Sequence, residues 1–576
     1  MTILLDARIA RTLDALTERL TAMPGSRVEA WVFEDADARR AAALRLADAG
    51  VTAVIRSAYK PLLHFFLDEL GLDGDGTGIA GVRRIAVRTP AAGTRAQAQR
   101  FRLETYPLAG MLPEGRLSLD QGDADGHYSV ELDGAVHRVF VPLAASGAPC
   151  GWLRLWQGDI CLEDGPLATE FELGFAAAMA AIRNHGWSRQ APYFDVLRIA
   201  IDTGGIERAL SYQDECISTR EALHEDLYFS VLEFFQDRAG LPRGDRTLQP
   251  GQIVPDIRPC DGATRIRMEL LPHPRAAAAE DDTATTALRA DALAVLPRPL
   301  TPDEAALAMH ALGGKRFQAN STQGRLVHGT CIEGALPGLV ISAGQHANES
   351  SGVVGALRAA HALALHPGAH FALVAMENPD GAALHARLRE DNPRHMSHAA
   401  RYTALGDDLE ARMAPPFGEK AARLEAIART GAGLHLSLHG YPAHEWTRPL
   451  TGYVPPGFEN WTLPKGFFLI LRHHAGRDGM AFMHALTAQL AASPELAAFN
   501  ARQLATWGRH AGEVPFPVLN GIPCMIVEDH RSTVPFTLVT EFPDQTIYGD
   551  AFRLAHTTQM RAVLGAAELY WAGLLD

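Results

Sequence analysis

The sequence predicts an α/β protein with more than one domain. Near its start, the strand-like run VEAWVF (28–33), a helical segment and the strand-like run VTAVIR (51–56) alternate in a βαβ rhythm. In the second half, apolar runs lead through polar turns into helices. The chain has 576 residues, whereas one hydrophobic core rarely extends beyond roughly 250–300 residues. Two or three domains are therefore expected.

The composition excludes several classes of protein. Hydrophobic residues make up 47% of the chain and charged residues 21%, which is typical of a globular protein and not of a disordered one. The formal charge of -14 comes without a long run of Lys or Arg, so nucleic acid is not an expected partner. The sequence contains no stretch of about 18 uninterrupted apolar residues, so no membrane span is predicted. Six scattered cysteines without CxxC spacing favour a reducing compartment, so a cytoplasmic location is expected.

The first twenty residues, MTILLDARIARTLDALTERL, carry apolar residues at three- and four-residue steps. This pattern predicts an amphipathic helix and lacks the basic-then-apolar layout of a secretory signal. Residues 1–190 are predicted to form an N-terminal α/β domain, whose role the sequence does not indicate.

Residues 191–299 are predicted to form a small middle α/β segment that ends in a linker. Its strands VLRIAID and TRIRMELLP flank a helical stretch, where Ser218 and Glu221 have capping-box spacing. The stretch PRAAAAEDDTATTALRADALAVLPRPLTPDE, rich in Ala, Asp, Thr and Pro, is typical of a linker that merges into a surface helix. The last domain is predicted over residues 300–576.

The most informative segment of that domain is PGLVISAGQHANESSGVVGALRAAHAL (337–363), an apolar strand followed by a turn and a helix. The turn carries His346 and Glu349 at the carboxyl end of the strand, where open α/β sheets place their sites. An imidazole and a carboxylate three residues apart can converge on one cation, and this pair suits Zn²⁺ better than Mg²⁺ or Ca²⁺. The HxxE pattern alone is common by chance. Its position between a strand and a helix supports a metal-binding role.

Three further segments follow in order. The strand-like HFALVAM leads into an Asn378–Gly381 turn, NPDG, and then into a helix. In GLHLSLHGYPAHEW, alternation places His435, Ser437 and His439 on one side of a strand and leucines on the other. In STVPFTLVTEFPDQ, Glu541 ends an alternating apolar strand.

These four segments, in this order, resemble the zinc carboxypeptidase family and the related succinylglutamate desuccinylase and aspartoacylase deacylases. The resemblance implies a mixed sheet flanked by helices over residues 300–576. It also implies one Zn²⁺ ion held by His346, Glu349 and His439, with Glu541 as the general base that takes a proton from water and passes it to the leaving nitrogen. His435 is the alternative third ligand.

Arginines after the NPDG turn are implied to act on the substrate. Arg389 or Arg394 would stabilise the oxyanion and Arg401 would orient a substrate carboxylate, with Arg387 as a further substrate-binding candidate. His444, on the loop after the histidine strand, is a candidate for contact with the substrate.

Two positions depart from the carboxypeptidase pattern. Ala400 precedes Arg401 where the family has Asn, and Asn348 stands where many members have an arginine beside the zinc turn. The stretch GQHANESSG shares features with the carboxypeptidase pattern and with the Gly-x-His-Gly-Asn-Glu turn of the deacylases, and it matches neither pattern completely. A peptide or amide hydrolase of metallocarboxypeptidase type is expected, and a deacylase of N-acyl amino acids is the second hypothesis. A binding module without turnover is the third, and a homo-oligomer is compatible with the sequence.

Overall fold

The structure, a computed structural model, describes residues 1–74, 78–124, 126–274, 290–452, 454–458, 461–511 and 514–575. Residues 275–289 of the predicted linker lie outside these ranges. Among the residues that are described, no helix combines the length and the apolar character needed to cross a membrane.

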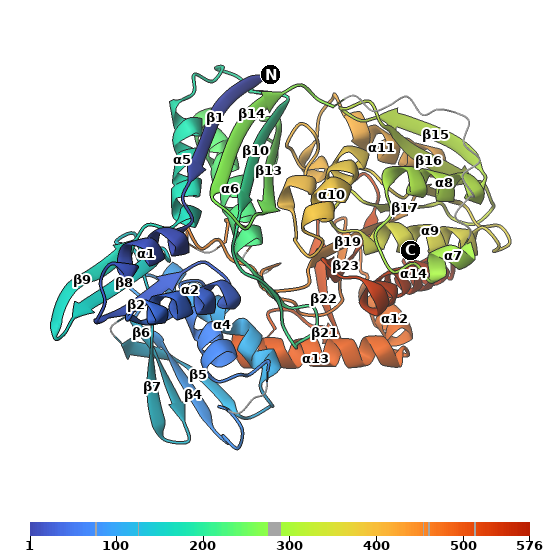
Figure 1. Ribbon diagram of the computed structural model, residues 1–576. Helices are drawn as coiled ribbons and strands as arrows, with labels where there is room; N and C mark the ends of the chain where they lie inside the picture. The colour runs from blue at the N-terminus through green and yellow to red at the C-terminus, as the bar shows by residue number, and fades with distance from the viewer. Residues whose placement is uncertain are drawn as a thin grey trace.

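The N-terminal part contains two four-stranded sheets, ordered β3-β2-β8-β9 and β5-β4-β6-β7 (Figure 1). The strands are β2 (Ser26–Val32), β3 (Thr52–Ser57), β4 (Ile85–Pro90), β5 (Leu117–Ala124), β6 (His127–Leu132), β7 (Ala135–Phe140), β8 (Gly151–Gln157) and β9 (Ile160–Leu167). The helices are α1 (Thr12–Thr21), α2 (Ala36–Asp48), α3 (Pro61–His64), the π-helical turn η1 (Phe65–Glu69) and α4 (Arg95–Met111). The predicted strand–helix–strand unit is confirmed as β2, α2 and β3, and the Asp35 side chain caps α2 by accepting the N–H of Ala38.

The helix predicted over the first twenty residues is wrong for its first half. Residues Thr2–Ile9 form strand β1, and α1 begins only at Thr12. Strand β1 pairs antiparallel with β14 (Thr264–Leu271), so the chain starts at the edge of a sheet that the middle segment builds. Local periodicity could not reveal this pairing, because the partner strand lies far away in the sequence.

Strand β1 and three strands of the middle segment form a four-stranded sheet with the order β1-β14-β10-β13. The further elements of the middle segment are β10 (Val196–Thr203), β13 (Gln252–Pro259), the short pair β11 (Glu207–Ala209) and β12 (Cys216–Ser218), and helix α6 (Thr219–Ala239). Helix α5 (Glu170–Asn184), at the end of the N-terminal part, packs against this sheet. Half of the predicted capping box is present, since the Ser218 hydroxyl accepts the N–H of Glu221 at 2.9 Å at the start of α6. The Glu221 carboxylate contacts Met396 and His444 instead of closing the box. Helix α6 is buried on almost every side, so it lies inside the molecule and not on its surface.

In the C-terminal part, the described strands form one sheet with the order β15-β16-β18-β17-β19-β23-β20-β22-β21. The strands are β15 (Lys315–Asn320), β16 (Leu326–Ile332), β17 (Leu339–Ala343), β18 (Phe371–Val374), β19 (Leu434–Pro442), β20 (Phe468–His473), β21 (Val518–Leu519), β22 (Ile522–Glu528) and β23 (Phe536–Gln545). Strands β18, β17, β19 and β23 run parallel, while β20 is antiparallel to β23. The predicted α/β fold with a mixed, helix-flanked C-terminal sheet is confirmed.

Helices cover both faces of this sheet (Figure 1). They are α7 (Ala290–Ala294), α8 (Pro302–Leu312), α9 (Ser351–Leu363), α10 (Pro379–Asp391), α11 (Ala421–Thr430), α12 (Met480–Ala491), α13 (Pro494–Ala511) and α14 (Gly549–Trp571). Leu434, Leu436 and Leu438 of β19 belong to the core formed with α9, α12 and α14, as the alternation predicts. The histidines of β19 lie on the other side of the strand.

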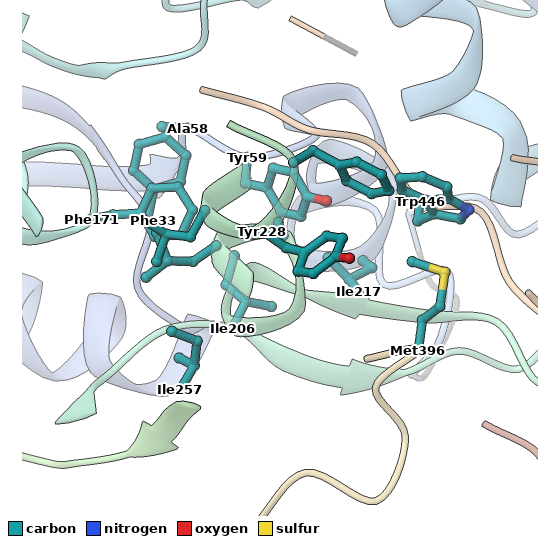
Figure 2. Close-up of a cluster of buried hydrophobic side chains, with 14 of the residues drawn as sticks. Phe33, Ala58, Tyr59, Phe171, Ile206, Ile217, Tyr228, Ile257, Met396 and Trp446 are labelled. Atoms are coloured by element: carbon teal, nitrogen blue, oxygen red, sulfur yellow. The ribbon is translucent and has the colours of Figure 1, made fainter. Parts of the chain in front are cut away.

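One of the hydrophobic clusters contains side chains from all three parts of the chain. Figure 2 shows side chains from the N-terminal part, such as Phe33 and Tyr59, together with Tyr228 of α6 and with Met396 and Trp446 from the C-terminal part. A buried ion pair between Lys60 and Glu445 adds a charged contact between the first and last parts. The C-terminal sheet is therefore packed directly against the rest of the chain.

Gly355 provides a test of the contact between α9 and α14. A Cβ added there would lie 2.5 Å from the Cβ of Gln559 and 3.1 Å from the carbonyl oxygen of His556. Alanine favours a helix over glycine by about 1 kcal/mol, but we expect Gly355→Ala to destabilise the protein by about 1–3 kcal/mol, because overpacking outweighs helix propensity. Urea unfolding curves would measure the difference.

Gly174→Ala in α5 is the matched control. A Cβ at this buried helical glycine would meet only Ile266 Cδ1, at an ordinary 3.5 Å. This variant should keep or gain stability. A Gly355→Ala protein as stable as the Gly174→Ala protein would contradict the close helix contact.

Candidate metal centre and active site

The turn between β17 and α9 holds two of the predicted ligands. His346 and Glu349 are buried, and His346 Nδ1 lies 2.9 Å from Glu349 Oε1. Burial alone would raise the pKa of Glu349, but the charges of His346 and Arg401 hold that pKa well below its usual value. The carboxylate of Glu349 is therefore ionised, as a metal ligand must be.

Strand β19 brings His439 to the same place. Its Nδ1 lies 2.9 Å from Glu349 Oε2 and 3.1 Å from His346 Nδ1. One ligand atom from each of the three side chains lies within 4.8 Å of the other two. The structure thus brings together the three residues that the sequence singled out.

His435, the alternative ligand, lies elsewhere on the strand. It lies four residues before His439 on the same side of the strand, and its Nε2 lies 2.8 Å from the hydroxyl of Ser342 on β17. Burial and the nearby charge of Arg423 lower the pKa of His435 to about 3, so the ring is neutral. His435 lines a neighbouring cavity of about 240 Å³ and takes no part in the group around Glu349.

Glu541 lies on β23 directly beside His439, because the two residues are partners in the parallel register of β19 and β23. Both line one cavity of about 120 Å³ together with His346 and Glu349. Burial and the negative charge of Glu349 raise the pKa of Glu541 well above its usual value. Its buried Oε2 accepts no hydrogen bond from the described part of the chain.

Asp408 is a site residue that the motifs did not reveal. Its carboxylate lies 3.3 Å from His346 Nε2, on the side of the ring away from Glu349. A carboxylate in this position fixes the orientation of a ligand histidine and raises its basicity. The only sequence signal was its place in the stretch AARYTALGDD, just after Arg401.

Arg401 is the one predicted arginine that lines the cavity. Its guanidinium Nη1 contacts Glu349 Oε1, and its Cζ lies 5.8 Å from the centre of the Phe458 ring.

Asn348 does not line the cavity. It is fully buried, and its amide donates at 3.1 Å to the carbonyl of Met396 and to Gln545.

The other predicted substrate residues lie outside the cavity lining. Arg387 pairs with Asp256 of β13 at 3.1 Å, because α10 packs against the middle sheet. Arg389 is beside Tyr548, and Arg394 is near Asp214. The prediction of substrate contact is therefore corrected for Arg387, Arg389 and Arg394, which lie outside the cavity lining, whereas Arg401 lines it.

His444 is also placed differently from the prediction. It lies on the segment after β19 but is fully buried, with Nε2 2.7 Å from Glu221 of α6. The buried helix α6 covers this segment, so His444 does not face the proposed substrate.

Residues far from the four motifs complete the cavity. Arg246, from the segment between α6 and β13, stacks on Phe458 at 5.2 Å and approaches Asp408 to 3.7 Å. His398 also lines the cavity, and its Nδ1 lies 2.6 Å from Glu225 of α6. The remaining lining residues include Glu410, Arg472, Arg531, Trp446 and Trp461. Trp446 is the last residue of the GLHLSLHGYPAHEW segment, whereas the other residues named here lie outside the four segments, with Arg246 in the middle segment and Arg472 on β20.

The residues present fit a zinc ion. Two imidazoles and an ionised carboxylate form a donor set that zinc accepts in hydrolases, where a further coordination position stays open. Glu349 Oε2 also accepts the backbone N–H of Gly440 at 3.1 Å, which fixes the carboxylate next to His439. The free Oε2 of the adjacent Glu541 gives the cavity a proton acceptor beside this donor set.

No protein-family model and no curated protein sequence matches this chain. Solved structures similar to it include metallocarboxypeptidases, an amidase and a deacylase. A metallo-carboxypeptidase from Pseudomonas aeruginosa is 16% identical, with 54% of this chain and 72% of that chain covered and a TM-score of 0.28. The murein-tripeptide amidase from Escherichia coli O157 is 16% identical, with 46% and 97% covered and a TM-score of 0.25.

A succinylglutamate desuccinylase/aspartoacylase from Rhodobacter sphaeroides is 13% identical, with 46% of this chain and 66% of that chain covered and a TM-score of 0.22. These proteins belong to the groups that the motifs resemble. At such identities and TM-scores the similarity does not assign an activity, so the proposal below rests on the site itself.

The two histidines of β19 give a matched test of the ligand set. We expect His439→Ala to bind one equivalent of zinc less than the wild-type protein, because the variant removes one of three donors of this site, while His435→Ala should bind as much as the wild type. Metal content of the purified proteins would be measured by atomic emission. Zinc loss in His435→Ala with retention in His439→Ala would contradict the ligand set, and wild-type protein without near-stoichiometric zinc would contradict the metal centre.

Proposed function

We propose that the protein is a zinc-dependent hydrolase that cleaves an amide bond in a peptide or an N-acyl amino acid. The observation that supports this most directly is the convergence of His346, Glu349 and His439 with Glu541 in one buried cavity. Zinc bound there would polarise the scissile carbonyl and make water a better nucleophile.

Glu541 is proposed to move the proton. Its place beside His439 puts a carboxylate within the cavity, next to the proposed ligands. Because burial raises the pKa of this carboxyl group, it accepts a proton more readily than an exposed glutamate does. Glu541 would take a proton from the attacking water and return it to the leaving nitrogen.

Arg401 is proposed to stabilise the negative charge that develops on the carbonyl oxygen. Its guanidinium contacts Glu349, so it lies next to the proposed ligand set. Arg389 and Arg394 lie outside the cavity lining, which leaves Arg401 as the predicted arginine placed for this role. A fixed cation in a buried site stabilises such charge without reorganisation of solvent.

Arg246 and Arg472 are proposed to bind an anionic group of the substrate. Both line the cavity, and Arg472 also lines the adjacent cavity of about 240 Å³ around His435. Glu410 pairs with Arg472 at 2.9 Å and leaves part of the guanidinium fork for a ligand.

A deacylase of N-acyl amino acids is the second candidate. The cavity of about 120 Å³ is small and partly enclosed by Trp446 and Phe458, which favours a compact substrate over a long peptide. Asn348 in the zinc turn also matches the deacylase pattern. Hydrolysis of a panel of dipeptides and N-acyl amino acids would separate the two candidates.

Glu541→Gln should retain zinc and lose activity. We expect kcat to fall by about 100- to 10,000-fold, because the amide cannot accept the proton while the ligands are unchanged. Steady-state kinetics and metal content would be measured together, with the exposed Glu528→Gln of β22 as the control. Unchanged kcat in Glu541→Gln would show that another group accepts the proton.

Arg401→Ala separates two possible roles of the guanidinium. If Arg401 stabilises the oxyanion, kcat should fall by about 100- to 1,000-fold on substrates with a free carboxylate and on their amidated analogues alike. Arg401→Lys should recover only part of the rate, since lysine lacks the planar fork. A rise in KM confined to substrates with a free carboxylate would instead assign Arg401 to carboxylate binding.

A further inference from the structure

A second group of metal-ligating side chains lies where the middle segment meets the C-terminal part. Cys216 begins β12, Glu221 is in the first turn of α6, and His444 follows β19. Their exposed fractions are 3%, 4% and 0%. One ligand atom from each lies within 4.8 Å of the other two. None of the three lines the cavity of the proposed active site.

We propose that Cys216, Glu221 and His444 bind one divalent transition-metal ion, with Zn²⁺ as the best fit, at a structural site separate from the proposed catalytic centre. A thiolate, an imidazole and a carboxylate are ligands that zinc accepts, whereas Mg²⁺ and Ca²⁺ require oxygen ligands. His444 Nε2 lies 2.7 Å from Glu221 Oε2, so these ligand atoms already face each other. In a tetrahedral site with metal–ligand bonds of about 2.0–2.2 Å the two ligand atoms are about 3.4 Å apart, so binding requires them to separate by about 0.7 Å.

The anionic groups around His444 favour a cation at this place. Besides Glu221, the carboxyl groups of Asp214, Glu215 and Glu445 interact electrostatically with His444. Among the residues that the structure describes, Oε1 of Glu215 and Oε1 of Glu445 are buried without a hydrogen-bond partner. Burial of carboxylates without such partners is costly.

The cations already present compensate only part of this charge. Lys60 pairs with Glu445 through the other carboxylate oxygen, and Arg394 lies near Asp214. A divalent ion bound by Cys216, Glu221 and His444 would add positive charge next to these buried carboxyl groups.

The proposed ion would connect α6 to two segments of the active site. His444 lies five positions after His439 on the same segment. The other oxygen of Glu221 accepts the N–H of Met396 at 2.7 Å, and the chain runs from there to Arg401. The ion would therefore hold both segments against the middle segment.

Binding would displace protons from the ligands. Cys216 gives up its thiol proton and binds as a thiolate, and the proton shared between His444 and Glu221 leaves as well. Both protons go to solvent, and no redox change is involved.

Cobalt substitution tests the proposal through a signal that only a thiolate ligand gives. The full-length protein would be stripped of metal and titrated with Co²⁺, which reports a sulfur ligand by a near-ultraviolet thiolate-to-cobalt charge-transfer band. We expect two equivalents of Co²⁺ per chain and this band in the wild-type protein. X-ray absorption of the zinc form should show a Zn–S distance of about 2.3 Å.

Variants then assign the band to one site. Cys216→Ser and His444→Gln should each bind one equivalent without the band, whereas His439→Ala should bind one equivalent and keep it. Cys524→Ala, at another buried free cysteine, should keep two equivalents and the band.

The wild-type spectrum decides the proposal even if a variant does not fold. One equivalent of Co²⁺ without the band would overturn the second site and leave the proposed catalytic centre intact. The band in wild-type protein with its loss in Cys524→Ala and not in Cys216→Ser would overturn the ligand assignment. Loss of metal from the catalytic site alone leaves the band unchanged, so the two proposals fail separately.

Discussion

Helix α6 holds the segments that form the cavity wall through carboxylates buried in the interior. The pairs are Glu221 with the N–H of Met396, Glu225 with the N–H and Nδ1 of His398, and Asp226 with the N–H groups of Leu450 and Thr451. A buried carboxylate that loses such donors costs several kcal/mol. The wall segments can therefore leave α6 only at a large free-energy cost, and the shape of the cavity depends on this helix.

The C-terminal sheet fixes the opposite side of the cavity. His439 and Glu541 are neighbours because β19 and β23 run parallel in register, and the turn after β17 places His346 and Glu349 beside them. Leu436 and Leu438 anchor β19 in the core on its other face. A shift of β19 by one residue would turn His439 into that core, so the hydrophobic pattern of the strand also sets the position of the ligand.

Sequence patterns were sufficient for the parts of the site that local structure determines. Strand alternation placed His439 opposite the buried leucines, and the strand–turn–helix pattern placed His346 and Glu349 at a sheet edge. Asp408, Arg246 and the pairing of β1 could not be predicted in this way, because each depends on a contact between segments far apart in the sequence. The arginines of α10 were misplaced for the same reason, since Arg387 pairs with Asp256 of the middle sheet and Arg389 lies beside Tyr548 at the start of α14.

The middle segment supplies side chains to the cavity and to its supporting wall. Arg246 adds a cation beside Asp408, which itself orients His346. The ring of His398 packs edge-on against Phe229 of α6 at 4.8 Å, and Trp446 stacks on the same phenylalanine at 6.1 Å. Without α6, both rings would lose their apolar support, and the carboxylates of that helix would lose the donors that stabilise them. Assembly of the middle segment and formation of the cavity are thus energetically coupled.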